Sequence, residues 1–120
     1  MNVDGIDVID LIGLAHSSQP SKPAWGVQTE DLNLNLIVLD ADSGVARHTN
    51  TEVDVLLVGI DGAGYVEIEG KTWRVGPGQA LVVPKGSLRS IRCEVDRFAY
   101  LSCHRRRAGL WPEGVPRHTL

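Results

Sequence analysis

Three residues with side chains suited to chemistry stand close together in the stretch "RHTNTEVD". His48 is followed by Asn50 two positions later and by Asp54 four positions after that. Alternate residues of an extended chain share one face, so we expect His48 and Asn50 to point the same way. An imidazole, an amide and a carboxylate together can hold a metal ion or form a hydrogen-bonded network that moves protons.

The elements that position these residues follow a period of two from Leu32 onward. In "LNLNLIVLD" the leucines alternate with Asn33 and Asn35, which predicts a half-buried strand. About eight short strands with Gly and Pro turns follow one another, as in "VDVLLVGIDGAG" and the hairpin around Glu69 and Gly70. This pattern predicts an all-β sandwich or barrel. Before it, residues 7–15 have helical spacing and residues 16–26 read as a loop.

Composition narrows the classes of function. A chain of 120 residues predicts one domain, and its net charge of -3 argues against a nucleic-acid-binding protein. No segment approaches the roughly 18 apolar residues of a membrane span, so we expect no membrane partner. Cys93 and Cys103 form no disulfide-scaffold or CxxC pattern, which favours free thiols and a cytoplasmic location.

A second motif lies in "GPGQALVVPKGSLRSI", where Gly78, Pro84 and Gly86 precede Arg89. Together with His48, Asn50 and Asp54, it resembles the two motifs of the cupin superfamily, over roughly residues 32–103. Arg89 stands where that family has a ligand histidine, and Asn50 where it has another. The resemblance implies a cupin-like jelly-roll β-barrel over residues 32–107, commonly a homodimer. Residues 1–31 would pack on the barrel or on a partner subunit, and residues 108–120 would form a tail.

The resemblance also implies a divalent metal inside the barrel, held by three histidines and a carboxylate. Arg89 cannot coordinate a metal, because it is always charged and has no lone pair to give. His104 offers a replacement if the last strand runs beside the start of "DVLLV", which gives His48, Asp54 and His104 as ligands for Fe, Mn, Ni or Zn. Strand parity argues against this, because His104 shares a face with Phe98, opposite the smoother apolar face of Ala99, Leu101 and Cys103.

The alternative is a metal-free pocket. Arg89 inside a barrel needs a counter-ion, and Asp54 is the expected one, with Asn50 and His48 completing the network. Such a pocket would bind a carboxylate, an enolate or a phosphate through the guanidinium group. The pair of Arg89 and Asp54 could equally be an internal salt bridge without a ligand.

We therefore expect a small, anionic organic molecule as the ligand of this chain. For isomerase, cyclase, lyase or dioxygenase chemistry, the catalytic candidates are His48, Asp54 and Arg89. Asn50, Arg89 and His104 are the ligand-binding candidates. A non-catalytic binding or sensor protein with the same network remains an open alternative, and so does a purely structural barrel.

Overall fold

The computed structural model describes residues 6–20 and 23–106. The proposed tail, residues 108–120, and the first five residues of the N-terminal segment lie outside this range. The elements are one short helix and seven strands: α1 (Leu11–Ser17), β1 (Pro23–Gln28), β2 (Leu32–Asp40), β3 (Gly44–Thr49), β4 (Val55–Ile68), β5 (Lys71–Val75), β6 (Ala80–Val83) and β7 (Leu88–Arg105). The described helix is too short to cross a membrane.

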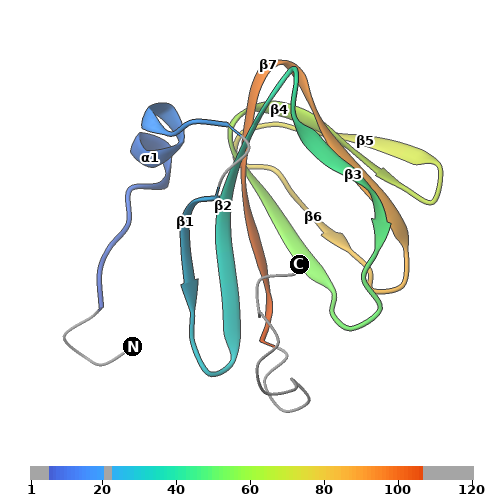
Figure 1. The fold of residues 1–120 in the computed structure, drawn as a ribbon, viewed down its shortest axis with the longest axis horizontal. Coiled ribbons are helices and arrows are strands. Elements are labelled where there is room, and N and C mark those ends of the chain that lie inside the picture. The colour runs from blue at the N-terminus through green and yellow to red at the C-terminus, as the bar shows by residue number, and fades with distance from the viewer. Residues whose placement is uncertain (1–5, 21–22, 107–120) are drawn as a thin grey trace.

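The strands form one antiparallel sheet that is folded over on itself (Figure 1). Its main order is β1-β2-β7-β4-β5, with β3 on β7 and β6 on β4. The two long strands, β4 and β7, run through both halves. The first half contains β1, β2, β6, the start of β4 and the end of β7; the second contains β3, β5, the end of β4 and the start of β7. The predicted all-β jelly-roll fold is confirmed, although the sheet is not closed.

Two glycines of β4 allow the sheet to fold over. The pairing of β4 with β7 shifts register between Gly59 and Asp61 and again between Gly62 and Gly64. Gly62 has a φ of 65°, and a Cβ there would overlap the carbonyl of Arg97. A Cβ on Gly64 would overlap the ring of Phe98. Only glycine fits at these close approaches, which bring the two halves face to face.

The main core lies between the two halves. Leu57 and Phe98 come from the first half, and Val66 and Cys93 from the second. Tyr100 packs beside Phe98 with the ring centroids 5.2 Å apart, and burial raises the pKa of its hydroxyl. The core begins at the folded-over end of the sheet, and Val55 and Ile68 pack against it near the opposite end, where β7 begins and ends.

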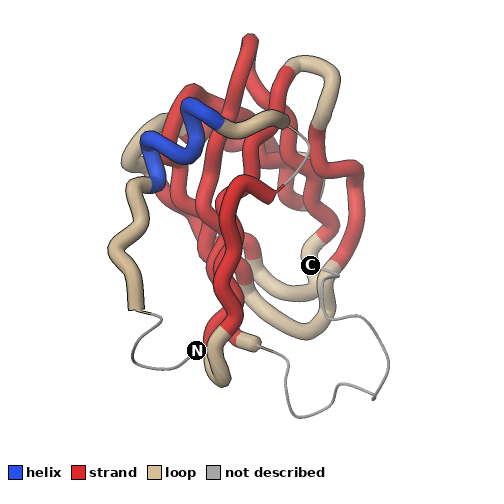
Figure 2. Tube along the Cα trace, turned by 60° about the vertical axis from the view of Figure 1, so that its left-hand side comes forward, coloured by secondary structure: helices blue, strands red, loops and turns tan. Residues whose placement is uncertain are grey.

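The helix α1 covers the outer surface of the first half (Figure 2). Asp10 caps it by accepting a hydrogen bond of 3.0 Å from the backbone N–H of Gly13. Ala15 is fully buried against Val38 and Ala99, and Arg97 donates to the carbonyl of Ala15. The outer surface of this half is apolar because a helix packs on it, so apolar character alone does not mark the interior.

Three local predictions are corrected by this arrangement. Residues 23–28 form β1 and pair with β2, although residues 23–26 of this strand fall in the stretch predicted to be a loop. On β2, Asn33 and Asn35 lie on the interior face with Leu39, while Leu32, Leu34 and Leu36 lie on the outer face, where Leu32 is 45% exposed. On β7, Phe98 and Tyr100 lie in the core while Ala99 faces α1, so the parity argument about the last strand was wrong.

Candidate functional site

Arg89 and His48 lie directly opposite each other on β7 and β3. Directly opposite residues of an antiparallel pair share one face, and Arg89 is only 4% exposed. His48 is half-buried, and its Nδ1 lies 2.9 Å from the carbonyl oxygen of Ala46. Because a carbonyl only accepts, this contact requires a proton on Nδ1, so in the neutral imidazole Nε2 is a hydrogen-bond acceptor. The two predicted residues therefore lie on the same interior face of the sheet, on neighbouring strands.

The guanidinium group of Arg89 is held by the turn between β6 and β7. Its Nε donates to the carbonyl of Ser87 at 2.9 Å, and Nη2 donates to the carbonyl of Pro84 at 3.0 Å. Nη1 has no hydrogen-bond partner among residues 6–20 and 23–106. Burial lowers the pKa of Arg89, but an arginine stays charged at neutral pH. The result is a buried, oriented cation with one nitrogen still free to donate.

Asp54 is not the counter-ion of Arg89, contrary to the sequence-based expectation. Its side chain is exposed, and Oδ1 accepts a hydrogen bond of 2.8 Å from the backbone N–H of Lys85. The three ion pairs within the described residues involve other side chains, so neither the predicted network nor the internal salt bridge forms there. Asp54 instead lines a cleft of about 380 Å³ at the rim, with Glu52, Val53, Lys85 and Arg105.

Asn50 also forms hydrogen bonds with backbone groups. Its side-chain Oδ1 accepts from the N–H groups of Glu52 (2.9 Å) and Val53 (3.4 Å), and its backbone carbonyl accepts from the N–H of Gly86 at 2.6 Å. Asn50 and Asp54 therefore tie the loop after β3 to the Pro84–Gly86 turn, which in turn holds Arg89. Gly86 has a φ of 83°, a conformation that explains the glycine of the second motif.

This role of Asp54 predicts how its variants behave. Asp54→Asn keeps an oxygen that accepts from Lys85 N–H, so its melting temperature should lie within about 2 °C of the parent. Asp54→Ala loses that hydrogen bond and should lower the free energy of unfolding by about 1 kcal/mol. Thermal unfolding of the two variants checks this. A large loss in Asp54→Asn alone would point to a lost ion pair and contradict the geometry.

His104 faces the interior, which settles the question left open by strand parity. It is 5% exposed and lies on the same face of β7 as Phe98 and Tyr100. The end of β7 runs antiparallel to the start of β4, with Cys103 opposite Leu56, as the resemblance implied. The Nδ1 of His104 lies 2.9 Å from the carbonyl oxygen of Arg105, and its Nε2 is buried without a hydrogen-bond partner.

The metal set predicted from the sequence does not assemble. His48 and His104 face the interior from different halves of the sheet, but Asp54 is exposed and bonded to Lys85. Asn50 uses its amide oxygen for two backbone N–H groups. Within residues 6–20 and 23–106 no three His, Cys, Asp or Glu side chains lie close enough together to hold a metal ion. The described residues therefore do not fit the four-ligand metal site that the resemblance implies.

Sequence reasoning missed three polar residues that face the interior on the first half. Asn33 lies opposite His104, and Asn35 lies opposite Ser102. Ser102 is 7% exposed, and Asn35 Nδ2 donates to Asn33 Oδ1 at 3.3 Å. The alternation of Asn and Leu on β2 was visible in the sequence, but it does not show which face is inside, because the outer face is also apolar and α1 covers part of it.

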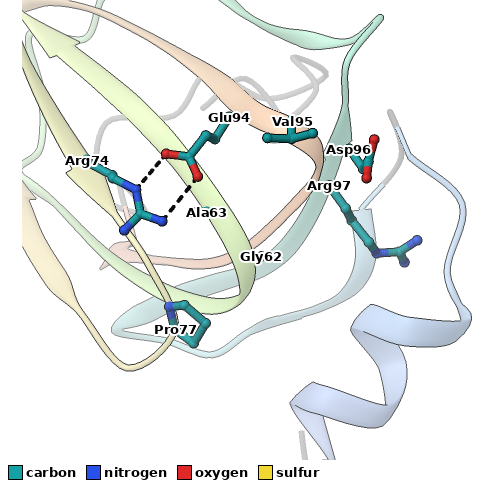
Figure 3. Close-up of a pocket in the computed structure, with 8 residues that line it drawn as sticks. All are labelled: Gly62, Ala63, Arg74, Pro77, Glu94, Val95, Asp96 and Arg97. Carbon is teal, nitrogen blue, oxygen red and sulfur yellow. Dashed lines mark hydrogen bonds and ion pairs between the residues drawn. The ribbon is translucent and has the colours of Figure 1, made fainter.

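A second hollow, of about 370 Å³, lies at the folded-over end (Figure 3). Arg74 reaches across it to Glu94, with Nε–Oε2 and Nη2–Oε1 distances of 2.6 and 3.1 Å. The hydrogen bonds from Arg74 and Tyr65 lower the pKa of Glu94. The ion pair therefore neutralises the charges of Arg74 and Glu94. Asp96 and Arg97 also line this hollow and form no ion pair within the described residues.

Several solved structures have a fold similar to that of this chain. A cupin-2 domain protein from Shewanella frigidimarina matches with a TM-score of 0.70 and 15% identity, over 82% of this chain and 95% of the other. Protein NMB1881 from Neisseria meningitidis matches with a TM-score of 0.70 and 18% identity, over 82% and 99%. KdgF from a Halomonas species matches with a TM-score of 0.63 and 23% identity, over 69% and 76%. The sequence matches no family model and no curated protein.

The chain thus has the cupin fold. Within that fold it places a buried arginine opposite a histidine, at the position where the resemblance implies a metal ligand. At these identities the comparisons show the fold alone.

Proposed function

We propose that the protein binds a small organic anion between the two halves of its sheet, with Arg89 recognising the negative charge. The observation that carries this proposal is the unpaired state of Arg89. It is 4% exposed and forms no ion pair within the described residues. A buried charge without a counter-ion costs several kcal/mol, and an anion supplied by a ligand would remove that cost.

The geometry of the guanidinium group suits this role. The backbone carbonyls of Pro84 and Ser87 hold Nε and Nη2, which fixes the orientation of the group before a ligand arrives. Nη1 remains to donate to a carboxylate or a phosphate, and charge-assisted hydrogen bonds are about twice as strong as neutral ones. His48, directly opposite, presents Nε2 as an acceptor to the same ligand. The proposal concerns binding and assigns no reaction.

Thermal unfolding in the presence of organic acids tests the proposal. Each acid is compared with its neutral amide, for example succinate with succinamide and benzoate with benzamide. We expect at least one acid to raise the melting temperature by several degrees at millimolar concentration, while its amide has no effect. If no acid stabilises the protein more than an inorganic salt of equal ionic strength does, the proposal fails.

A further inference from the structure

The interior of the first half carries a surface that the anion site does not use. Four polar residues continue the face of Phe98 and Tyr100 along β2 and β7 away from the core. We call them the polar wall: Asn33, Asn35, Ser102 and His104. Arg89 and His48 lie on the interior face of the second half. That half lies opposite the first one, because β4 and β7 fold over and run through both halves (Figure 1).

His104 is the member of the polar wall with an unmet bonding requirement. The contact of Nδ1 with the carbonyl of Arg105 requires a proton on Nδ1, so the neutral imidazole carries its lone pair on Nε2. That Nε2 is buried and has no hydrogen-bond partner, in a side chain that is 95% buried. A buried acceptor without a donor is unfavourable, and such groups in native proteins call for a partner.

The neighbours of His104 show what kind of partner fits. Ser102 Oγ has no hydrogen-bond partner within the described residues. Asn35 Nδ2 donates to Asn33 Oδ1, so the oxygen of one amide and the nitrogen of the other remain for further bonds. The polar wall therefore carries hydrogen-bond donors and acceptors side by side. A hydroxyl group both donates and accepts, and it matches such a surface better than a charged group does.

We propose that the polar wall binds a hydroxyl group of the same ligand whose anionic group is bound by Arg89. The hydroxyl donates to His104 Nε2. The ligand class is then a small hydroxylated organic acid rather than a simple carboxylate. This inference rests on the proposed function, because it takes the anion at Arg89 as given and adds a second point of recognition on the facing half of the sheet.

Calorimetry with matched pairs of acids tests the inference on the full chain. The pairs differ by one hydroxyl: malate and succinate, lactate and propionate, citrate and tricarballylate. In at least one pair, we expect the hydroxy acid to bind about tenfold or more tightly than its partner, because the partner leaves buried polar groups unpaired. Equal affinity within every pair overturns the inference but leaves anion binding intact. No binding by any acid overturns the proposed function itself.

His104→Phe keeps a ring of similar size and removes the lone pair. We expect the variant to bind the deoxy acid as tightly as the parent does. The ratio of the affinities for the hydroxy acid and the deoxy acid should fall to about one. An unchanged preference would contradict the role of His104. The nitrogen resonances of His104 in the parent give the same answer without a variant. Its Nε2 signal should move when the hydroxy acid binds and stay in place when an equally saturating deoxy acid binds; identical shifts would overturn the inference.

Discussion

Replacing Arg89 with methionine should abolish stabilisation by organic acids while leaving the protein folded. Methionine has a flexible apolar side chain that can fill the space of the arginine stem. Losing a buried, oriented cation should weaken anion binding by about 2–5 kcal/mol, which is about 30-fold or more. Calorimetry with the most stabilising acid measures this loss.

The same substitution has a second expected consequence, for the protein without ligand. Arg89 is buried with no ion pair among the described residues, so methionine removes the cost of burying an unpaired charge. It also removes the hydrogen bonds to the carbonyls of Pro84 and Ser87, which acts in the opposite direction. Arg89→Met should therefore melt within a few degrees of the parent. Arg92→Met is the matched control: Arg92 lies on the same strand but is exposed, over the ring of Tyr65 at 4.4 Å. This control should bind the acid as the parent does. Equal binding by Arg89→Met and Arg92→Met would contradict the assignment.

The second large effect is expected at the fold-over of β4. Gly62→Ala places a side chain at a φ of 65° and drives its Cβ into the carbonyl of Arg97. The strain and the overlap together should cost about 3 kcal/mol or more, and the melting temperature should fall by about 10 °C. The reason is that β4 can no longer approach β7 where the two halves are joined.

Gly70→Ala is the control for that substitution. Gly70 has a similar backbone conformation, with a φ of 82°, but a Cβ there meets nothing within 4 Å. Gly70→Ala should lower the free energy of unfolding by about 1 kcal/mol, which is the cost of holding alanine in a left-handed conformation. Chemical denaturation of both variants separates the two contributions. Equal losses would mean that the close approach of Gly62 to β7 does not hold the fold together.

Much of this fold could be predicted because glycine and proline mark turns locally. Gly78 and Gly86 have φ values of 76° and 83°, as the turns of the second motif require. The period of two identified β2, and the pairing of the last strand with the start of β4 followed from the resemblance. These features depend on neighbouring residues or on strand order, both of which the sequence contains.

The direction of the side chains could not be predicted in the same way. Ala99 belongs to a smooth apolar face that indicated the interior, yet it packs against Ala15 of α1 on the outside. Nothing in the strand itself says that a helix covers that face. The pairing of Asp54 with Arg89 failed for a similar reason, since each side chain bonds to backbone groups of one turn, at Lys85, Pro84 and Ser87. Such contacts depend on turn geometry rather than on charge.

The most direct test of the account follows the arginine side chains by nuclear magnetic resonance during titration with an organic acid. If Arg89 binds the anion, its guanidinium signals should shift and saturate together with the binding curve from calorimetry, while the signals of the exposed Arg92 stay in place. Shifts confined to Arg92 and other exposed arginines, with Arg89 unchanged at saturation, would contradict the proposal that the interior of this protein binds an anion.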